Sequence, residues 1–395
     1  MKILVLGSDG YIGYPLTLHL LNRGHEVFGI DNYSRRKRVN FVDSDSLTPI
    51  ATVMDRRIYL RSLKGFVDQV NLSLGVDSFS FIASILRSFK PNTIIHLAEQ
   101  PSAPWSMSYL ERAAITQQEN VIGTLHLLWA MKQECPKAHL VKLGTMGEYG
   151  TPNCDIPEGE IPLTCIGSHK YESMKDACPM RGLPFPKSPG SFYHLSKVHD
   201  THNIIFACKT WGLTSTDIMQ GVVFGLAAQE NTFSDKKLTR FDYDQYFGTV
   251  INRFCTQAIA GIPLTVYGKG NQKRGFLTLD DSILCLTLAI ENNTPEQGEY
   301  RTFNQFENVY SINELAKLVR NGASLLRLNP SIQTLENPRT ESENHYYNPT
   351  HQKLFDLGYK PNTNIQREIT SLIRQLLPYK DRINKDVIMP TTTWR

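Results

Sequence analysis

The sequence lacks paired cysteines: its seven cysteines are scattered over 395 residues, and no two of them form a Cys-x-x-Cys motif. An odd number of cysteines without paired spacing argues against both a disulfide framework and a zinc site, and no metal is predicted. Cys154, Cys165 and Cys178 share one loop, but their spacing is not that of a metal site. Free thiols are typical of a reducing compartment, so we expect a cytoplasmic protein.

Long apolar runs and an excess of one charge are also missing. No stretch approaches the roughly 20 apolar residues that are needed to cross a bilayer, and the first residues have the pattern of a strand, not of a cleavable signal. Lys and Arg number 42 against 38 Asp and Glu, which gives a net charge of +4. This balance offers no broad positive field for nucleic acid. We therefore predict neither a membrane partner nor a nucleic-acid partner.

What the sequence does contain is an alternation of strand and helix patterns. Short apolar runs, such as 3–6 and 139–145, have the pattern of strands buried on both faces, and amphipathic segments follow them. This repetition predicts an α/β fold with a Rossmann-type doubly wound parallel sheet and a smaller C-terminal α/β substrate-binding lobe. We place the Rossmann-type domain at 1–225, with an insertion loop at 151–190, and the substrate-binding lobe mainly at 226–395. A return of the C-terminal chain to the first domain is left open.

A glycine-rich turn joins the first predicted strand to the first predicted helix. Gly7, Gly10 and Gly13 permit a tight turn, close approach of the backbone to a pyrophosphate, and close packing of helix on strand. Asp31 ends the second predicted strand, where a carboxylate accepts hydrogen bonds from the adenosine ribose and repels a 2′-phosphate. The arginines after Asp31 could accommodate such a phosphate, but the aspartate weighs more, so NAD is predicted. The cofactor-binding candidates are Gly7, Gly10, Tyr11, Ile12, Gly13, Asp31, Asn32, Tyr33, Arg35, Arg36, Gly75, Val76, Leu97, Asn120, Tyr193, Lys197, Gln220 and Val223.

Tyr193 and Lys197 are four residues apart on a predicted helix, so their side chains share one face. An ammonium near a phenol favours the phenolate, which predicts that Lys197 lowers the pKa of Tyr193 from about 10 toward working pH. Thr145 ends a predicted strand and is expected to bind the same substrate oxygen. The three residues predict a base that takes a hydroxyl proton as hydride leaves for NAD. The alternative is an ordinary surface helix, which the glycine-rich turn makes less favourable.

These three residues resemble the catalytic set of the extended short-chain dehydrogenase/reductase superfamily. Longer motifs, among them GTMGEYG, YHLSKVHD, FDYDQYFGT, NPRTESENHYYN and IMPTTTW, are similar to those of the UDP-sulfoquinovose synthases over nearly the full chain. The resemblance implies conversion of UDP-glucose and sulfite to UDP-sulfoquinovose by NAD-dependent C4 oxidation, C5/C6 dehydration, sulfite addition at C6 and C4 re-reduction. It also implies a homodimer that uses helices near 105–130 and 193–210. The sequence does not identify a sulfur-donor protein.

The resemblance also implies roles for single residues. Tyr193 becomes the C4 base, Lys197 tunes its pKa and Thr145 orients the substrate, while His194 and Glu148 remain for proton transfers at C5 and C6. Ser102 is a further candidate for sulfite, and Arg253 and Lys269 are weaker candidates for the diphosphate. The substrate-binding candidates are Gln100, Thr145, Met146, Gly147, Glu148, His194, Gln220, Arg274, Arg339 and Tyr346.

Some positions depart from the expected patterns. Met146 and Gly147 stand where common 4,6-dehydratases carry Asp-Glu, which argues against an ordinary dehydratase. The resemblance leads us to expect an arginine at Pro101, so sulfite or sugar recognition is predicted to differ in detail. A UDP-hexose 4-epimerase, a 4,6-dehydratase and, with least weight, a non-catalytic dinucleotide sensor are the alternatives. The loop 151–190 either covers the sugar as a lid or is a tolerated surface insertion.

Overall fold

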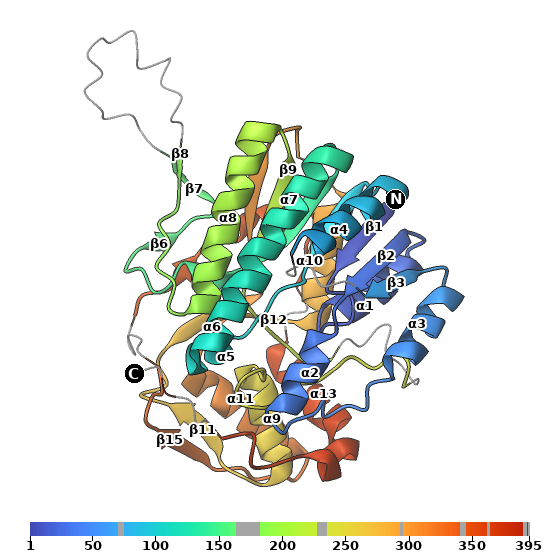
Figure 1. Cartoon of the computed structure of the whole chain (residues 1–395). Helices are drawn as coiled ribbons and strands as arrows, with labels where there is room; N and C mark the ends of the chain where they lie inside the picture. The colour runs from blue at the N-terminus through green and yellow to red at the C-terminus, as the bar shows by residue number, and fades with distance from the viewer. Residues whose placement is uncertain are drawn as a thin grey trace, which may run out of the picture.

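The centre of the computed structural model is a seven-stranded sheet with the order β13-β9-β5-β4-β1-β2-β3 (Figure 1). The model describes residues 1–69, 75–162, 182–226, 235–292, 295–339, 345–361, 364–389 and 393. Every pairing in this sheet is parallel. The strand order reverses between β1 and β4, so a crevice forms there outside the carboxyl ends of the strands. The strands are β1 (Lys2–Leu6), β2 (Glu26–Asp31), β3 (Phe66–Gln69), β4 (Thr93–His96), β5 (His139–Thr145), β9 (Thr214–Gln220) and β13 (Tyr300–Gln305).

Helices cover both faces of the sheet because alternate side chains of each buried strand point to opposite sides. Leu4 and Leu6 of β1 pack in one apolar cluster with residues of α4, α7 and α8, and Ile3 and Val5 pack in another with residues of α1 and α10. The predicted doubly wound α/β fold is therefore confirmed. The helices of this layer arrangement are α1 (Gly13–Asn22), α2 (Ser34–Phe41), α3 (Val53–Ser62), α4 (Gly75–Phe89), α5 (Ala103–Ser108), α6 (Leu110–Gln117), the π-helix η1 (Gln118–Ile122), α7 (Gly123–Glu134), α8 (Phe192–Trp211) and α10 (Leu279–Glu291).

The long helix α8 carries the candidate catalytic pair, and local sequence fixes where it begins and ends. The Ser191 hydroxyl accepts a hydrogen bond from the backbone N–H of His194 at 3.1 Å, which is an N-cap. Gly212 ends the helix in the left-handed region, with φ of +68°, which glycine adopts without steric cost. These two caps place Tyr193 in the first turn, beside the carboxyl end of β5.

The second lobe is built from two small sheets and three helices around their own apolar cluster. One sheet has the order β10-β12-β14 and the other pairs β11 with β15. The chain also returns to the first lobe, because β13 lies at the edge of the main sheet beside β9. The division at residue 225 therefore stays a prediction for the chain as a whole. The elements of this lobe are β10 (Val222–Phe224), α9 (Val250–Ala260), β11 (Leu264–Tyr267), β12 (Lys273–Thr278), β14 (Asn308–Ser311), α11 (Ile312–Leu325), β15 (Ile332–Leu335), α13 (Ile365–Leu376) and the 3-10 helix η4 (Leu377–Arg382). The short helix α12 (Gln352–Asp356) packs with the first lobe, since Leu354 belongs to the cluster around α1 and α10.

Short strands flank the predicted insertion loop. β6 (Asp155–Ile156) pairs with β16 (Asn348–Pro349), and β7 (Glu160–Pro162) pairs with β8 (Gly182–Pro184). Residues 163–181 lie outside the described part of the chain, so the choice between lid and surface insertion stays open. Among the helices described, none is long and apolar enough to cross a membrane.

Candidate functional site

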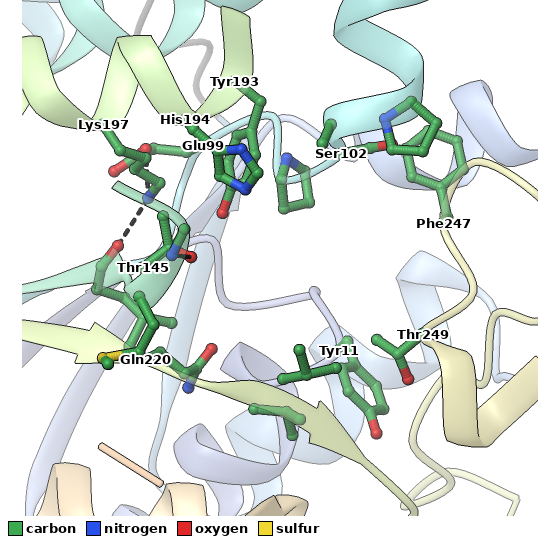
Figure 2. A pocket seen from close by; sticks show the side chains of 18 of the residues that line it. Tyr11, Glu99, Ser102, Thr145, Tyr193, His194, Lys197, Gln220, Phe247 and Thr249 are labelled. Atoms are coloured by element: carbon green, nitrogen blue, oxygen red, sulfur yellow. Dashed lines mark hydrogen bonds and ion pairs between the residues drawn. The ribbon is translucent and has the colours of Figure 1, made fainter. Parts of the chain in front are cut away.

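A cavity of about 790 Å³ lies at the carboxyl ends of β1, β2, β4, β5 and β9 and reaches into the second lobe (Figure 2). This is the crevice that the reversal of strand order creates. Its wall joins the glycine-rich turn at one end to Thr145 and α8 at the other. The glycine-rich turn and the Tyr193–Lys197 pair therefore border the same cavity.

The glycine-rich turn has the geometry of a pyrophosphate cradle. Gly7 has a φ of +85°, and a Cβ on it would lie 2.7 Å from the carbonyl of Leu97. A Cβ on Gly13 would lie 1.9 Å from the carbonyl oxygen of Gly7. Only glycine fits at these two positions, so the backbone at the start of α1 borders the cavity directly. Free N–H groups and the helix dipole favour an anion at such a helix start.

Asp31 ends β2 at the cavity wall, where the sequence placed the ribose contact. Its two carboxylate oxygens accept backbone hydrogen bonds from Asp9 at 2.8 Å and from Tyr33 at 2.6 Å. Burial, together with the negative charge of Asp9, raises the pKa of Asp31 to about 6. The group is therefore largely ionised at neutral pH, and its remaining lone pairs suit the hydroxyls of a ribose.

The two arginines after Asp31 are both paired with carboxylates. Two side-chain nitrogens of Arg36 donate to the carboxylate oxygens of Asp9, at 2.6 Å and 2.9 Å. Arg36 is not among the described residues that line the cavity. The expectation that Arg36 contacts the cofactor is corrected, because its guanidinium is committed to the glycine-rich turn. Arg35 does line the cavity, and its Nε donates to Asp242 at 2.9 Å.

Thr145, Tyr193 and Lys197 meet at one corner of the cavity, as Figure 2 shows. A hydrogen bond links the hydroxyl of Thr145 to the phenol of Tyr193. Lys197 lies one helical turn further along α8, and its Nζ is 6.0 Å from the centre of the Tyr193 ring. The arrangement presents a phenol, an alcohol and an ammonium to one small volume, as proton removal from a hydroxyl requires.

The pKa of Tyr193 is raised, not lowered as the sequence led us to expect. Burial is the main cause, followed by the negative charges of Glu99 and Glu148. The ammonium of Lys197 forms an ion pair with Glu99 and donates to the carbonyl of Leu143 at 2.6 Å. The negative charge of Glu99 therefore balances the ammonium of Lys197 next to the phenol.

His194 explains the departure at Met146 and Gly147. A Cβ on Gly147 would lie 2.3 Å from Nε2 of His194, so no larger residue fits at that position while the imidazole is there. Nδ1 of His194 lies 3.0 Å from the hydroxyl of Ser191. Burial and the nearby charges of Arg339 and Arg274 lower the pKa of His194 to about 3. The imidazole is therefore neutral, and it lies in the cavity wall above Gly147.

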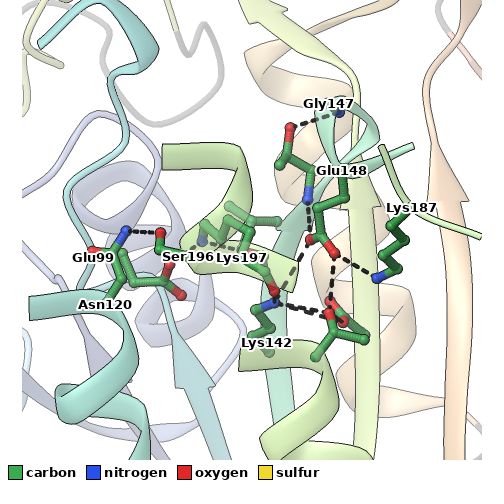
Figure 3. A network of polar contacts seen from close by, with 12 residues as sticks. Glu99, Asn120, Lys142, Gly147, Glu148, Lys187, Ser196 and Lys197 are labelled. Atoms are coloured by element: carbon green, nitrogen blue, oxygen red, sulfur yellow. Dashed lines mark hydrogen bonds and ion pairs between the residues drawn. The ribbon is translucent and has the colours of Figure 1, made fainter. Parts of the chain in front are cut away.

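Glu148 lies behind the catalytic corner, and its side chain is fully buried (Figure 3). It contacts Lys187 at 2.5 Å and Lys142 at 3.8 Å, and it accepts the backbone N–H of Thr145 at 3.3 Å. Burial alone would raise the pKa of Glu148, but the charges of Lys142 and Lys187 lower it. The role of Glu148 in proton transfer stays a prediction; this carboxylate is not among the described residues of the cavity wall and supports Thr145 from behind it.

Arginines of the second lobe border the other side of the cavity. Arg274 and Arg339 both lie in its wall, and Arg274 contacts His345 at 3.0 Å. Arg253, on α9, also lines the cavity and donates to the hydroxyl of Tyr267 at 2.7 Å. Guanidinium groups suit the oxygens of a diphosphate.

Tyr346 was predicted to contact the substrate, but it is the neighbouring Tyr347 that lines the cavity. Tyr346 is 49% exposed and donates to Asp155, away from the cavity, whereas Tyr347 is buried in the cavity wall. Gln220, at the end of β9, does line the cavity, and its amide nitrogen donates to Ser282 at 2.8 Å.

Two predicted contacts are internal supports. Gln100 and Asn120 are fully buried: the side-chain oxygen of Asn120 accepts the backbone N–H of Gln100 at 2.7 Å, and its side-chain nitrogen donates to Ser196 at 2.8 Å. These bonds hold the loop after β4 against α8, and neither residue is among the described residues that line the cavity. Gly75 and Val76 begin α4, and their side chains lie outside the described part of the chain.

The structure thus separates the candidates into two groups. In the cavity wall it places Gly7, Gly10, Tyr11, Ile12, Gly13, Asp31, Asn32, Arg35, Leu97, Ser102, Thr145, Met146, Gly147, Tyr193, His194, Lys197, Gln220, Val223, Arg253, Arg274 and Arg339. The described residues of that wall do not include Tyr33, Arg36, Gln100, Asn120, Glu148, Lys269 or Tyr346.

Sequence reasoning missed Glu99, Asp242, Lys187 and Tyr347. Glu99 carried a usable signal, because it is a carboxylate that directly follows a buried strand at the cofactor edge of the sheet. Asp242 and Lys187 carried none, since their partners are distant in the sequence.

Comparison with known proteins agrees with this geometry. The model of the NAD dependent epimerase/dehydratase family matches residues 3–304. The chain is 46% identical to the chloroplastic UDP-sulfoquinovose synthase of Spinacia oleracea, over 100% of this chain and 79% of that protein. It is 44% identical to the UDP-sulfoquinovose synthase of Sulfolobus acidocaldarius, over 100% of this chain and 98% of that protein.

Solved structures share the fold at lower identity. The UDP-glucose 4-epimerase of Thermus thermophilus in complex with NAD has a TM-score of 0.64 and 21% identity, covering 95% of this chain and 99% of the other. The UDP-glucose 4-epimerase of Thermotoga maritima with UDP-glucose has a TM-score of 0.68 and 18% identity, covering 95% and 98%. At these identities the likeness concerns the fold alone.

Proposed function

The chain belongs to the NAD-dependent epimerase/dehydratase family and, within it, to the UDP-sulfoquinovose synthases, and we propose that it joins sulfite to UDP-glucose to form UDP-sulfoquinovose. It is an enzyme of that type and uses NAD. The observation that carries the proposal is the full-length similarity to two such synthases. The cavity supports it, since it holds both a dinucleotide cradle and a proton-transfer corner.

The residues that would hold NAD are those of the cavity's first end. The backbone of the glycine-rich turn would bind the pyrophosphate, and Asp31 would accept the ribose hydroxyls. When bound, NAD supplies a hydride acceptor that later returns the hydride. Arg253, Arg274 and Arg339 would bind the diphosphate of the sugar nucleotide.

The reaction balances without an external oxidant. With NAD bound as hydride acceptor, Tyr193 would take the C4 hydroxyl proton, and Thr145 would orient that hydroxyl. The resulting C4 ketone would acidify C5, so that a C5 proton and the C6 hydroxyl could leave as water. Sulfite would then form the C6–S bond while C5 regains a proton. When C4 is reduced again, Tyr193 would return the proton to its oxygen.

His194 is the described side chain best placed for proton transfer at C5 and C6. It is neutral, adjoins Tyr193 with ring centres 5.0 Å apart, and lies in the cavity wall. A neutral imidazole can accept a proton and later return it. Because His194 is neutral, it adds no third positive charge beside Arg274 and Arg339.

Mass spectrometry of the purified protein with UDP-glucose, with and without sulfite, tests the proposal. We expect a sulfite-dependent product in which one hydroxyl is exchanged for a sulfonate, and no product from the Tyr193→Phe variant. Formation of UDP-galactose without any sulfonated product would instead assign a 4-epimerase. A 4-keto-6-deoxy sugar would assign a 4,6-dehydratase.

We also propose a homodimer, with a cytoplasmic location as a further prediction from the free thiols. The helices α6, α7 and α8 expose large apolar side chains, including Leu110 at 80%, Trp129 at 41% and Phe206 at 58%. Apolar side chains at such exposure on adjoining helices are typical of a surface that a second copy covers. Sedimentation should give a dimer for the natural chain and a smaller species for Phe206→Glu. A monomer at micromolar concentration for the natural chain would refute this.

A further inference from the structure

Glu99 is a buried carboxylate beside the catalytic corner to which no step of the proposed reaction gives a role. It follows β4, three residues after His96, and its side chain is only 2% exposed. It also lines the cavity. Figures 2 and 3 show it near Lys197 of α8.

The glutamate controls where the ammonium of Lys197 lies. An ion pair joins Glu99 Oε2 to Lys197 Nζ, and a second bond of 2.6 Å joins that Nζ to the carbonyl oxygen of Leu143. Two of the three N–H donors are thereby committed to the protein. Both oxygens of Glu99 are buried and have no further hydrogen-bond donor in the described structure, so Lys197 is the cation that balances its charge. Glutamate and lysine therefore form a pair without net charge next to the phenol.

Other charged groups around this pair come from three elements. His96 of β4 lies 3.9 Å from Glu99, and burial lowers the pKa of that histidine to about 4, so it is neutral. Burial and the charge of Glu99 raise the pKa of Asp200 of α8 well above its usual value, which favours its protonated form. Lys142 of β5 is ionised and is balanced by Asp217 at 3.6 Å.

The charges that act on the phenol of Tyr193 itself are few. Glu99 and Glu148 disfavour the phenolate, whereas Lys142 and the hydroxyl of Thr145 favour it. His194 is neutral and so adds no charge. Among the carboxylates, Glu99 has the larger effect, and it is the one in the cavity wall.

We propose that Glu99 is a positioning residue for the catalytic base: it holds the ammonium of Lys197 in a neutral pair and thereby keeps Tyr193 protonated until the cavity is filled. The natural chain therefore avoids a permanent phenolate in the empty site. An oxidised nicotinamide ring carries a positive charge, so its arrival would favour the phenolate only when hydride transfer is possible. This last step rests on the proposed function, whereas the effect of Glu99 on the phenol does not.

The test measures the phenol directly, in protein without substrate or cofactor. Ultraviolet difference spectra between each protein and its Tyr193→Phe counterpart isolate the tyrosinate signal of this one residue, in a titration that runs from neutral pH up to the highest pH at which both proteins stay folded. Glu99→Gln removes the negative charge while keeping the shape of the side chain. We expect the Tyr193 signal of Glu99→Gln to appear at a pH about one unit or more below that of the natural chain, which is the usual size for one adjacent charge.

Two controls make the result decisive. Glu99→Asp keeps the charge, so we expect it to titrate close to the natural chain. Glu134→Gln removes a carboxylate from a remote ion pair with Arg87 and should leave the Tyr193 signal unchanged. Thermal melting checks that each variant is folded. If Glu99→Gln is folded and its Tyr193 titrates as in the natural chain, or at higher pH, the proposal is overturned.

A kinetic measurement links the inference to the proposed reaction. With UDP-glucose and NAD but no sulfite, absorbance of the reduced cofactor follows C4 oxidation. The acid limb of its pH profile should move to lower pH in Glu99→Gln. If no reduced cofactor forms with the natural chain, the proposed function fails while the spectroscopic titration still decides the role of Glu99.

Discussion

The two ends of the cavity pair their cations in different ways. At the nucleotide end the cations are arginines, and Arg35 and Arg36 contact Asp242 and Asp9 with side chains that are 21% and 18% exposed. At the catalytic end they are lysines, and Lys197, for example, has a side chain only 5% exposed. Arginine stays ionised in either setting, whereas lysines, carboxylates and phenols in a buried network share protons. The ion pairs at the nucleotide end therefore determine which charged ligand binds, and those at the catalytic end determine which side chains carry protons.

The largest effect is expected from breaking the buried network behind Thr145. Glu148→Gln removes the carboxylate partner of Lys187 and leaves Lys142 with Asp217 alone in a buried network, so we expect the free energy of unfolding to fall by about 3 kcal/mol. Activity at a temperature where the variant is folded should change far less than it does in Tyr193→Phe. Urea unfolding and turnover, measured side by side, provide the check.

This variant also distinguishes a support from a proton donor. If Glu148 gave protons to the substrate, turnover would collapse while stability stayed near that of the natural chain. A double-mutant cycle with Lys187→Met should show strong coupling between the two side chains, since they lie 2.5 Å apart. If the two substitutions lower the free energy of unfolding additively, the ion pair between Glu148 and Lys187 is not the source of this stability.

The pH dependence of the same variant follows from the sign of the shift. The pKa of Glu148 is lowered in the folded chain from its usual 4.5. Its contribution to stability is therefore complete above about pH 5 and is lost as the pH falls through the folded value. The difference in unfolding free energy between the natural chain and Glu148→Gln should stay constant from pH 8 to about 5 and narrow below that.

Much of the fold and part of the site could be predicted because their signals are local. The apolar run 139–145 coincides with β5, and the glycine spacing after β1 encodes a turn whose geometry needs no distant partner. The same holds for Tyr193 and Lys197, which helix periodicity alone places on one face. These are statements about neighbouring residues, and the chain itself enforces them.

What the sequence could not predict depends on distant partners. Lys197 was expected to lower the pKa of Tyr193, but burial of the phenol, together with the charge of Glu99 from the loop after β4, raises it. Tyr346 and Tyr347 differ only in which one faces inward, and no strand or helix period fixes that choice in an irregular segment. Such pairings become visible only when the tertiary structure brings the partners together.

A smaller effect is expected at the nucleotide end, where it sharpens the contrast with the lysine network. Asp242 is 207 residues from Arg35, yet it accepts the Nε of that arginine at 2.9 Å, and the guanidinium stacks 4.1 Å from the centre of the Phe247 ring. This clamp keeps the cavity-lining Arg35 neutralised, so the clamp and Asp31 together disfavour a 2′-phosphate. Asp242→Asn removes the charge and keeps the shape, and we expect it to tighten NADP binding about tenfold, or 1.4 kcal/mol.

The affinity for NAD should change little in this variant, because NAD carries no phosphate at that position and Asp31 is untouched. Calorimetric titration with each cofactor measures the ratio, and Glu134→Gln serves again as a remote control. Unlike the effect of Glu99, this one should be nearly independent of pH between 7 and 9, since an arginine does not titrate there. A pH-dependent gain, or equal tightening of NAD and NADP, would mean that Asp242 acts on the shape of the cavity and not on the charge that Arg35 presents.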